Sequence, residues 1–302
     1  MSEVKAMNGT SIVLATDLSD ASVEAARWAQ EASERLNLPV TVIYVVSISV
    51  ANWATGAYDV LETPAIMEDS RAKVSDWYAE ATGKAPAESR VLVGHIPVQI
   101  RQETEKIDAA MLVLATSAKT RWKQFFLGST AQSLAHVPPC PVILVRPEEE
   151  MGSTTVKEIA VGIDFSSNSI DALAHSAAHA RAAGAKIHLV HAGKSPKFML
   201  GLEHLPEEVI QTDYQKWATE QMNDFIGAHA DKLEGIEIET HILEDYPSHG
   251  LLEFTESNEV DMLVVGRTGH SSLISDTVGD VLLKVLQSVP TTTCIVPAEP
   301  AE

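Results

Sequence analysis

The chain repeats one pattern of residues in its two halves. Ile12-Val13-Leu14-Ala15-Thr16-Asp17 in the first half corresponds to Ile159-Ala160-Val161-Gly162-Ile163-Asp164 in the second, 147 positions later. A second pair of segments, 111–115 and 262–266, is offset by 151 positions, so order and spacing agree between the halves. A repeat of this length is a duplicated domain, because solenoid units span only about 20 to 50 residues. We therefore predict two domains, at residues 8–147 and 156–298.

Composition limits the class of protein and its partners. The 302 residues suffice for two domains of about 150 residues each. No apolar run of about 18 residues is present, and the first residues lack a basic start followed by an apolar stretch, so we expect a cytoplasmic protein. The net charge of −20 repels nucleic-acid phosphates and anionic lipid, so we expect neither nucleic acid nor a membrane as a partner.

Short apolar runs alternate with amphipathic stretches in each half. The apolar runs predict buried strands at 11–15, 40–46, 90–93, 111–114 and 142–145, and again at 159–163, 186–192, 237–243, 262–265 and 294–296. Two long polar stretches are each predicted to hold one helix, at about 63–82 and about 206–232. This alternation is typical of an α/β fold with parallel sheets and helices on both faces. Ligands of such folds bind outside the carboxyl ends of the strands.

Two features follow predicted strands at that end of the fold. The first strand of each half ends at an acidic residue, Asp17 or Asp164, and a serine two positions later is a residue type that caps helix N-termini. In the second half, Gly266-Arg267-Thr268-Gly269 follows the fourth strand, and Gly279-Asp280 comes after nine intervening residues. Glycines before a helix N-terminus let the backbone approach an anion, so this spacing indicates a phosphate cradle.

The segments around these glycines resemble the universal stress protein family. The first half carries Gly128-Ser129-Thr130 and then Pro139-Cys140-Pro141-Val142 before its last strand, and the second half carries the run 261–269. The resemblance covers nearly the whole chain, twice. It implies two tandem five-stranded parallel-sheet α/β sandwich domains, of the adenine-nucleotide alpha-hydrolase-like, Rossmann-like type.

The resemblance also implies a ligand, since some members of the family bind ATP. It assigns Asp17 and Asp164 to the adenine end of the ligand. Val45 and Ala192, at the ends of the second strands, would offer backbone contacts. The loop positions that would wrap the ribose and phosphates are Ala115, Ala118, Gly128, Ser129 and Thr130 in the first half, and Gly266, Arg267, Gly269, Gly279 and Asp280 in the second.

Each half departs from that binding pattern in its own way. The first half has Ala115 and Ala118 in place of glycines, and alanine disfavours positive φ. The second half keeps its glycines but has Asp280 in the serine position, where a carboxylate takes the place of a phosphate. We therefore expect a weak or degenerate adenine-nucleotide site for ATP or AMP, and otherwise no cofactor.

Two other functions remain open beside a ligand-sensing regulator of the stress response. An ATP-using enzyme of related fold would carry a Ser-Gly-Gly-x-Asp-Ser loop or a His-x-Gly-His signature, and neither follows the first strands. We therefore predict no catalytic residue and no enzyme. The alternative is a nucleotide-free protein–protein interaction module. Its apolar last strands would be exposed edges, so we predict that they pair within the chain as a pseudo-dimer, with a homodimer of chains as a further partner.

The last residues that could form a functional site are histidines and cysteines. His175 and His179 share one helix face at i and i+4, and we interpret them as surface or interface histidines rather than metal ligands. His188 and His191, three apart on a strand, should point to opposite faces. We predict no metal site. Cys140 and Cys294 do not occupy equivalent positions, which favours two buried, reduced thiols.

Overall fold

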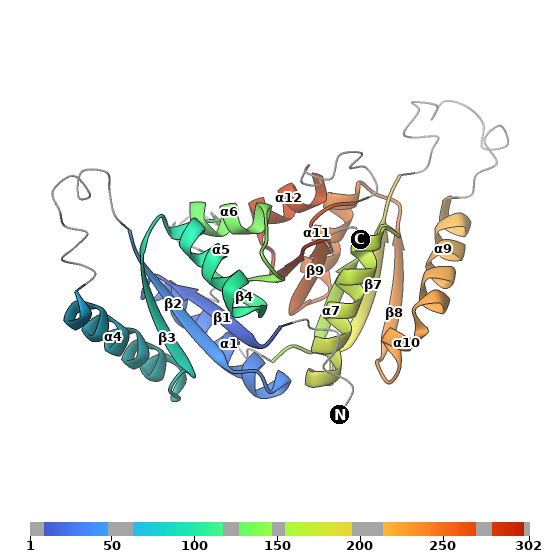
Figure 1. Ribbon diagram of the computed structural model, residues 1–302. Helices are drawn as coiled ribbons and strands as arrows, with labels where there is room; N and C mark the ends of the chain where they lie inside the picture. The colour runs from blue at the N-terminus through green and yellow to red at the C-terminus, as the bar shows by residue number, and fades with distance from the viewer. Residues whose placement is uncertain are drawn as a thin grey trace. The chain divides into compact units, whose positions relative to one another are not determined.

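Strands and helices alternate along the chain in the same order twice (Figure 1). The computed structural model describes residues 9–47, 63–116, 127–146, 155–194, 214–269 and 280–298. The first half contains β1 (Ser11–Thr16), α1 (Ala21–Leu36), β2 (Val40–Ser47), α4 (Pro64–Thr82), β3 (Glu88–Gly94), α5 (Ile96–Ile107), β4 (Ala109–Ala115), α6 (Ser129–His136) and β5 (Val142–Val145). The second contains β6 (Glu158–Gly162), α7 (Ser167–Ala183), β7 (Lys186–Ala192), α9 (Tyr214–Ala228), α10 (Ala230–Leu233), β8 (Ile238–Leu243), α11 (Pro247–Ser257), β9 (Met262–Gly266), α12 (Asp280–Ser288) and β10 (Thr292–Val296).

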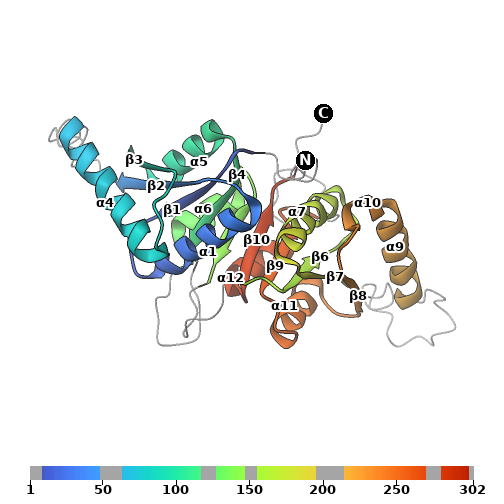
Figure 2. The same cartoon turned by 90° about the horizontal axis from the view of Figure 1, so that it is seen from below.

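The chain divides into two compact units, and the last strand of the sequence belongs almost entirely to the first. Unit 1 joins the described residues up to 146 with 287–295. Its strands follow the order β3-β2-β1-β4-β5-β10. The strands β3 to β5 are parallel, whereas β10 runs antiparallel to β5, with Cys294 opposite Ile143. Helices α1 and α4 contact one another on one face, and α5 and α6 on the other (Figure 2).

Unit 2 comprises the described residues from 155 to 286 together with the chain from 296. Its strands follow the order β9-β6-β7-β8 and are all parallel. Helix α7 packs against β6 and β9 and contacts α10, while α11 packs against β7. The predicted α/β class with parallel strands and interleaved helices is therefore confirmed.

The core forms where apolar strands meet helices with small side chains. Every residue of β4 but its last is buried, and on α1 the residues Ala25, Ala26, Ala29 and Ala32 have no exposed surface. Small side chains let the helix lie close to the sheet, and area removed from water stabilises the unit by about 25 cal/mol per Å². Equivalent residues end the first helix of each unit, since Asn37 (φ 53°) and Gly184 (φ 67°) both adopt left-handed C-caps.

The structure corrects the sequence prediction at one helix and one strand. The single helix expected at 206–232 is wrong in its described part, because the chain breaks at His229 between α9 and α10, and residues 206–213 lie outside the described ranges. Strand β3 begins two residues before the predicted start at position 90. Among the described helices, none is both long and apolar enough to cross a membrane.

The two thiols match their prediction. Cys140 and Cys294 are both free and buried. Burial raises the pKa of Cys140 to about 12 and lifts the pKa of Cys294 well above its usual range.

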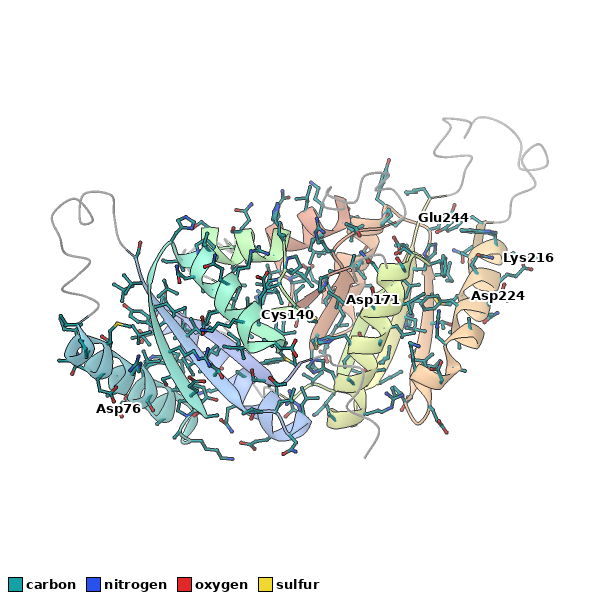
Figure 3. All side chains as sticks on the ribbon, in the orientation of Figure 1. Asp76, Cys140, Asp171, Lys216, Asp224 and Glu244 are labelled. Carbon is teal, nitrogen blue, oxygen red and sulfur yellow. The ribbon has the colours of Figure 1, made fainter. Side chains whose placement is uncertain are left out.

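Figure 3 shows Cys140 within unit 1, whereas Lys216 and Asp224 lie on the outer side of α9 in unit 2.

Candidate functional site

Asp164 follows the carboxyl end of β6 and is held by the serines that begin α7. Its Oδ1 accepts hydrogen bonds from Ser166 Oγ at 2.5 Å, Ser169 Oγ at 2.6 Å and the Ser166 backbone N–H at 3.1 Å. Ser169 Oγ in turn accepts a bond from the Asp164 N–H at 2.9 Å. Between them, Phe165 adopts a left-handed backbone with φ 64°. The carboxylate is thus fixed in one orientation by its own loop.

The same arrangement occurs at Asp17 in unit 1. Asp17 Oδ1 accepts bonds from the Ser19 N–H at 3.0 Å and from Ser22 Oγ at 2.9 Å, and Leu18 has φ 61°. Burial alone would raise the pKa of Asp17, but the hydrogen bonds from Ser19 and Ser22 outweigh burial and hold that pKa below its usual value. The duplicated motif is therefore an acidic residue with serines two and five positions later.

These bonds correct the predicted role of the serines. The N-cap position of α1 is Asp20 and that of α7 is Ser166, and neither makes a side-chain cap bond. Ser19 instead donates its backbone N–H to Asp17, and Ser166 donates both its backbone N–H and its Oγ to Asp164. The residue types suited to capping are present, but a charged acceptor two positions earlier forms the stronger bond.

The glycine loop after β9 is hydrogen-bonded to the start of α7 and packs against the connection between β6 and α7. Asn168, which is buried, donates from Nδ2 to the Thr268 carbonyl at 3.0 Å and also contacts Thr268 Oγ1. A Cβ added to Gly266 would lie 2.8 Å from Asn168 Cβ, and one added to Gly269 would lie 2.4 Å from Asp164 Oδ2. The backbone N–H of Arg267 bonds the Val296 carbonyl at 2.9 Å. These glycines are therefore required by packing within the protein, a reason that the sequence pattern did not reveal.

The corresponding positions of unit 1 are only partly described. Ala115 ends β4, and the next residue, Thr116, donates its N–H to the Val145 carbonyl at 2.9 Å, as Arg267 does to Val296 in unit 2. Gly128 stands at the N-cap of α6, where an added Cβ would meet no atom within 4 Å. After it, Ser129 is exposed and Thr130 half-buried.

Three predicted positions cannot be placed. Ala118 and Gly279 lie outside the described residues. Asp280 begins α12, but its side chain lies outside the described part of the chain.

An aromatic cluster lies beside the end of β7 in unit 2. His191 stacks against Phe165 with ring centroids 4.6 Å apart, and Trp217 lies 6.3 Å from both rings. His191 donates from Nδ1 to the Ile163 carbonyl at 2.8 Å, so its Nε2 accepts the Tyr214 hydroxyl at 2.9 Å. Burial lowers the pKa of His191, opposed by the Ile163 carbonyl and by Asp164. Both ring nitrogens of His191 are thus bonded within the protein, whereas Tyr214 and Trp217 were missed because they come from a helix distant in the sequence.

The predicted residues gather at one end of each unit. Asp164, Gly266 and Gly269 contact one another directly or through Asn168, and Ala192 ends β7, the neighbour of β6. Asp17 follows β1 and Ala115 ends β4, whereas Val45, expected at the end of its strand, lies two residues before the end of β2, beside the end of β1.

The structure corrects the prediction for His175 and His179 and confirms the prediction for His188 and His191. His175 and His179 are 3% and 2% exposed, so the surface interpretation is wrong. Their Nε2 atoms lie 3.2 Å apart, and burial lowers the pKa of His175 to about 4. His188 contacts Phe254 of α11 whereas His191 contacts Trp217 of α9, so the two point to opposite faces as predicted.

The chain is similar to known proteins over nearly its whole length. A sequence model of the universal stress protein family matches residues 10–146 and 155–297. A universal stress protein of Mycolicibacterium smegmatis is 24% identical over 94% of this chain and 96% of its own length. The crystal structure of a universal stress protein from Archaeoglobus fulgidus covers 99% of this chain and 100% of its own, with 17% identity and a TM-score of 0.66. Another protein from A. fulgidus, solved in complex with dAMP, covers 46% of this chain and 98% of its own at 23% identity, with a TM-score of 0.33.

Proposed function

The chain belongs to the universal stress protein family, and from this premise we propose that it is a ligand-sensing regulatory protein of the stress response. Its ligand in this proposal is an adenine nucleotide, bound at the carboxyl ends of β6 and β7. The proposal treats residues 8–147 and 156–298 as its two domains and assigns it no catalytic turnover. The observation that carries the proposal is the glycine loop, which is hydrogen-bonded to Asn168 and packed against Asp164, beside an exposed aromatic side chain.

The first part of the glycine loop supports ligand binding because contacts within the protein already hold its backbone. Asn168 donates to the Thr268 carbonyl, and Gly266 and Gly269 pack against Asn168 and Asp164, so binding would not have to position this part of the loop. In this proposal Asp164 positions the loop, since its Oδ1 already accepts three bonds from serines. Arg267, in the same loop, supplies the positive charge for a phosphate.

The aromatic cluster supports a ligand with a flat base. Trp217 is 44% exposed while it contacts Phe165 and His191, so one part of the indole remains open for stacking. Stacking of a base on an aromatic side chain contributes about 1–3 kcal/mol. The backbone of Ala192, at the end of β7, is assigned to the edge of the base.

The negative charge of Asp280 decides which adenine ligand we expect unit 2 to bind most tightly. Helix α12 begins at Asp280, where the family pattern has serine. A carboxylate about 5 Å from a triphosphate costs on the order of 1 kcal/mol even when well solvated. We therefore expect adenosine or AMP to bind unit 2 more tightly than ATP does. Binding of ATP in unit 1, next to Gly128, Ser129 and Thr130, is the alternative placement.

Two measurements test the nucleotide proposal. Mass spectrometry of the small molecules released on denaturation identifies any ligand that is retained through purification. Isothermal titration of the full chain with adenosine, AMP and ATP then measures affinity, and no heat with any of them would overturn the proposal. Trp217→Ala should weaken adenosine binding about 5- to 100-fold, whereas Trp217→Phe should retain most of it.

The pairing of β5 with β10 favours a second candidate function. Here the protein is a nucleotide-free interaction module that acts through a pseudo-dimer of its own two domains. The antiparallel register of Thr293 with Leu144 and of Ile295 with Val142 supports it, because this pairing covers an apolar strand edge. Sedimentation analysis of the full chain distinguishes a single chain, paired internally, from a homodimer of chains.

A further inference from the structure

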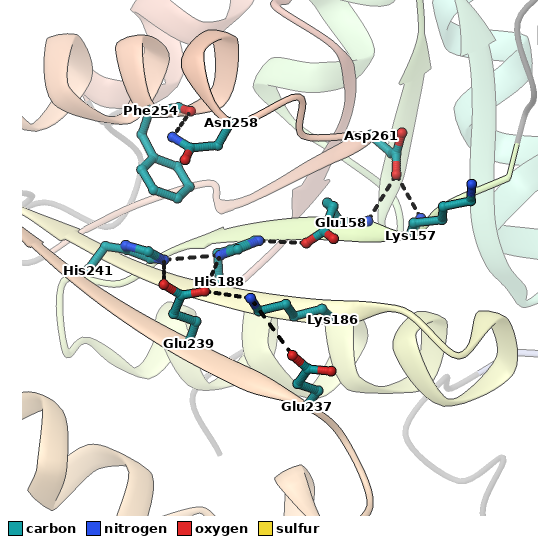
Figure 4. A network of polar contacts seen from close by, with 10 residues as sticks. All are labelled: Lys157, Glu158, Lys186, His188, Glu237, Glu239, His241, Phe254, Asn258 and Asp261. Atoms are coloured by element: carbon teal, nitrogen blue, oxygen red, sulfur yellow. Dashed lines mark hydrogen bonds and ion pairs between the residues drawn. The ribbon is translucent and has the colours of Figure 1, made fainter.

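Four side chains from three neighbouring strands of unit 2 converge on one face of the sheet (Figure 4). They are Glu158 of β6, His188 of β7, and Glu239 and His241 of β8, and we call them the histidine–carboxylate cluster. His188 lies opposite Glu239 in the parallel register, and side chains two residues apart on a strand share a face. The face is the one covered by α11, whose Phe254 contacts both imidazoles.

Three side chains of this cluster hold their ligand atoms close to the spacing of a tetrahedral metal site, with one atom from each side chain within 4.8 Å of the others. His188 Nδ1 lies 3.0 Å from His241 Nε2. Glu239 places Oε2 at 3.9 Å from His188 Nδ1 and Oε1 at 3.8 Å from His241 Nε2. Tetrahedral zinc with bonds of about 2.0–2.1 Å separates its ligand atoms by about 3.3–3.4 Å. Small side-chain rotations would therefore bring the two imidazole nitrogens and one oxygen of Glu239 onto one ion.

Glu158 fixes the orientation of His188 for such a role. Its Oε2 lies 2.7 Å from His188 Nε2, and a carboxylate can only accept there, so Nε2 carries the hydrogen. Nδ1 then presents its lone pair to His241. Asp261 holds the start of β6 in place by accepting from the backbone N–H groups of Lys157 and Glu158 at 2.7 and 2.9 Å. A carboxylate on the far nitrogen of a histidine is the usual outer partner of a metal-bound imidazole.

The charges around the cluster suit a divalent cation. Glu158, Glu237 and Glu239 contribute three negative charges, and Lys186 contributes one positive charge. Lys186 Nζ lies 2.5 Å from Glu239 Oε2 and 3.8 Å from Glu237 Oε1. With neutral imidazoles the group carries two net negative charges, which one divalent ion balances.

We propose that His188, His241 and Glu239 bind a divalent transition-metal ion, Zn²⁺ in the first instance, and that Glu158 orients His188 for it. Two imidazoles and one carboxylate favour zinc and its neighbours over Mg²⁺ or Ca²⁺, which prefer all-oxygen sites. Three protein ligands leave one tetrahedral position for water, and the half-exposed side chain of Glu239 opens the site to solvent. None of these residues belongs to the proposed nucleotide site, so the two proposals stand independently.

A second group in the same unit supplies the matched control. Asp245, His249 and Glu253 also bring three ligand atoms together, but this group has one imidazole and its His249 and Glu253 are exposed. His249→Gln therefore removes an accessible histidine without touching the histidine–carboxylate cluster. His241→Gln and Glu239→Gln each remove one proposed ligand, and Glu158→Gln changes only the outer partner.

The experiment is a Zn²⁺ titration of the full chain, chelator-treated and without a histidine tag, with a competing chelator and calorimetric detection. We expect one Zn²⁺ per chain, and an affinity at least about 100-fold lower in His241→Gln and Glu239→Gln, since loss of an outer partner alone costs about 10- to 100-fold. Glu158→Gln should keep the stoichiometry with an affinity reduced within that range, and His249→Gln should bind as the wild type does. Co²⁺ bound at the site should give the intense visible absorption of tetrahedral coordination.

Three results would overturn the proposal: no Zn²⁺ bound by the wild-type chain, undiminished binding in Glu239→Gln, or loss of binding in His249→Gln. Circular dichroism of each variant separates lost binding from lost folding. Glu239 is half exposed, so its variant carries the test if His241→Gln does not fold.

Discussion

Gly269 lies so close to Asp164 that a Cβ atom added to the glycine would stand 2.4 Å from Asp164 Oδ2. The two residues are 105 positions apart in the sequence, and their contact joins the loop after β9 to the loop after β6. Any side chain at this glycine must displace a carboxylate that three hydrogen bonds hold in place. The contact thus makes the shape of the glycine loop depend on the first strand of the same unit.

Gly269→Ala should destabilise unit 2. Overpacking against a fixed group costs about 1–3 kcal/mol, measurable as a lower urea midpoint. Gly227→Ala is the matched control, because Gly227 lies within α9 and an added Cβ meets nothing within 4 Å. That change should stabilise by about 0.4–1 kcal/mol, because alanine restricts the unfolded chain. Equal effects of the two substitutions would contradict the packing role of Gly269.

The buried His175 should make the protein less stable in mild acid. Burial holds the pKa of His175 at about 4 in the folded state, while the unfolded side chain titrates near 6.5. Between these values the unfolded chain binds the extra proton, so the free energy of unfolding falls by up to about 3 kcal/mol as pH drops from 6.5 to 4. Urea unfolding at pH 7, 6, 5 and 4.5 measures this slope.

His175→Gln should flatten that slope, because glutamine keeps a hydrogen-bonding group beside His179 and does not titrate. His249→Gln is the contrasting variant. Its hydrogen bond with Asp245 raises the pKa of His249, so protonation of His249 favours the folded state. Removing it should leave the acid slope in place or steepen it. A wild-type slope in His175→Gln would refute the assignment.

Asp280→Ser should improve binding of ATP relative to adenosine. Helix α12 begins at Asp280, and a carboxylate there repels a phosphate that would otherwise meet the helix N-terminus. Removing it should tighten ATP binding about fivefold, the equivalent of about 1 kcal/mol, and leave adenosine unchanged. Asp224→Asn removes the same charge from an exposed position on α9, outside the glycine loop, and serves as control (Figure 3). A similar gain in both variants would indicate a general effect of net charge.

Cys140 and Cys294 should resist a thiol reagent in the native protein. Both are buried, and burial raises both pKa values, so little reactive thiolate forms at pH 8. We expect labelling of both residues only after unfolding in urea. Cys294 lies opposite Ile143 in the ladder, so fast native labelling of Cys294 alone would show that β10 separates from β5.

The sequence predicted those features that arise from local periodicity and from comparison of the two halves. Apolar runs located the strands, and their order indicated the parallel sheets. The positions of Asp164 and Gly269 at the ends of strands also followed, because parallel strands bring their carboxyl ends together. The reason for the glycines did not follow, since it depends on the contact with Asp164 and Asn168.

Features that depend on register or on packing partners could not be predicted. Glu158, His188 and His241 are spread over 83 positions, and only the parallel register of β6, β7 and β8 brings them together. The burial of His175 was missed because helical spacing identifies a face of α7 but not what covers it. The serine bonds to Asp17 and Asp164 were missed because the same residue types also suit helix caps.

The placement of β10 has a consequence for how the protein is made. During synthesis the apolar edge of β5, residues 142–145, emerges about 150 residues before its partner strand. At roughly 5–20 residues per second, the ribosome needs about 8–30 s to deliver β10. For that interval the nascent chain carries an open hydrophobic edge that invites pairing with neighbouring chains. Premature termination before β10 would leave this edge open permanently, so such fragments should depend on chaperones for their solubility.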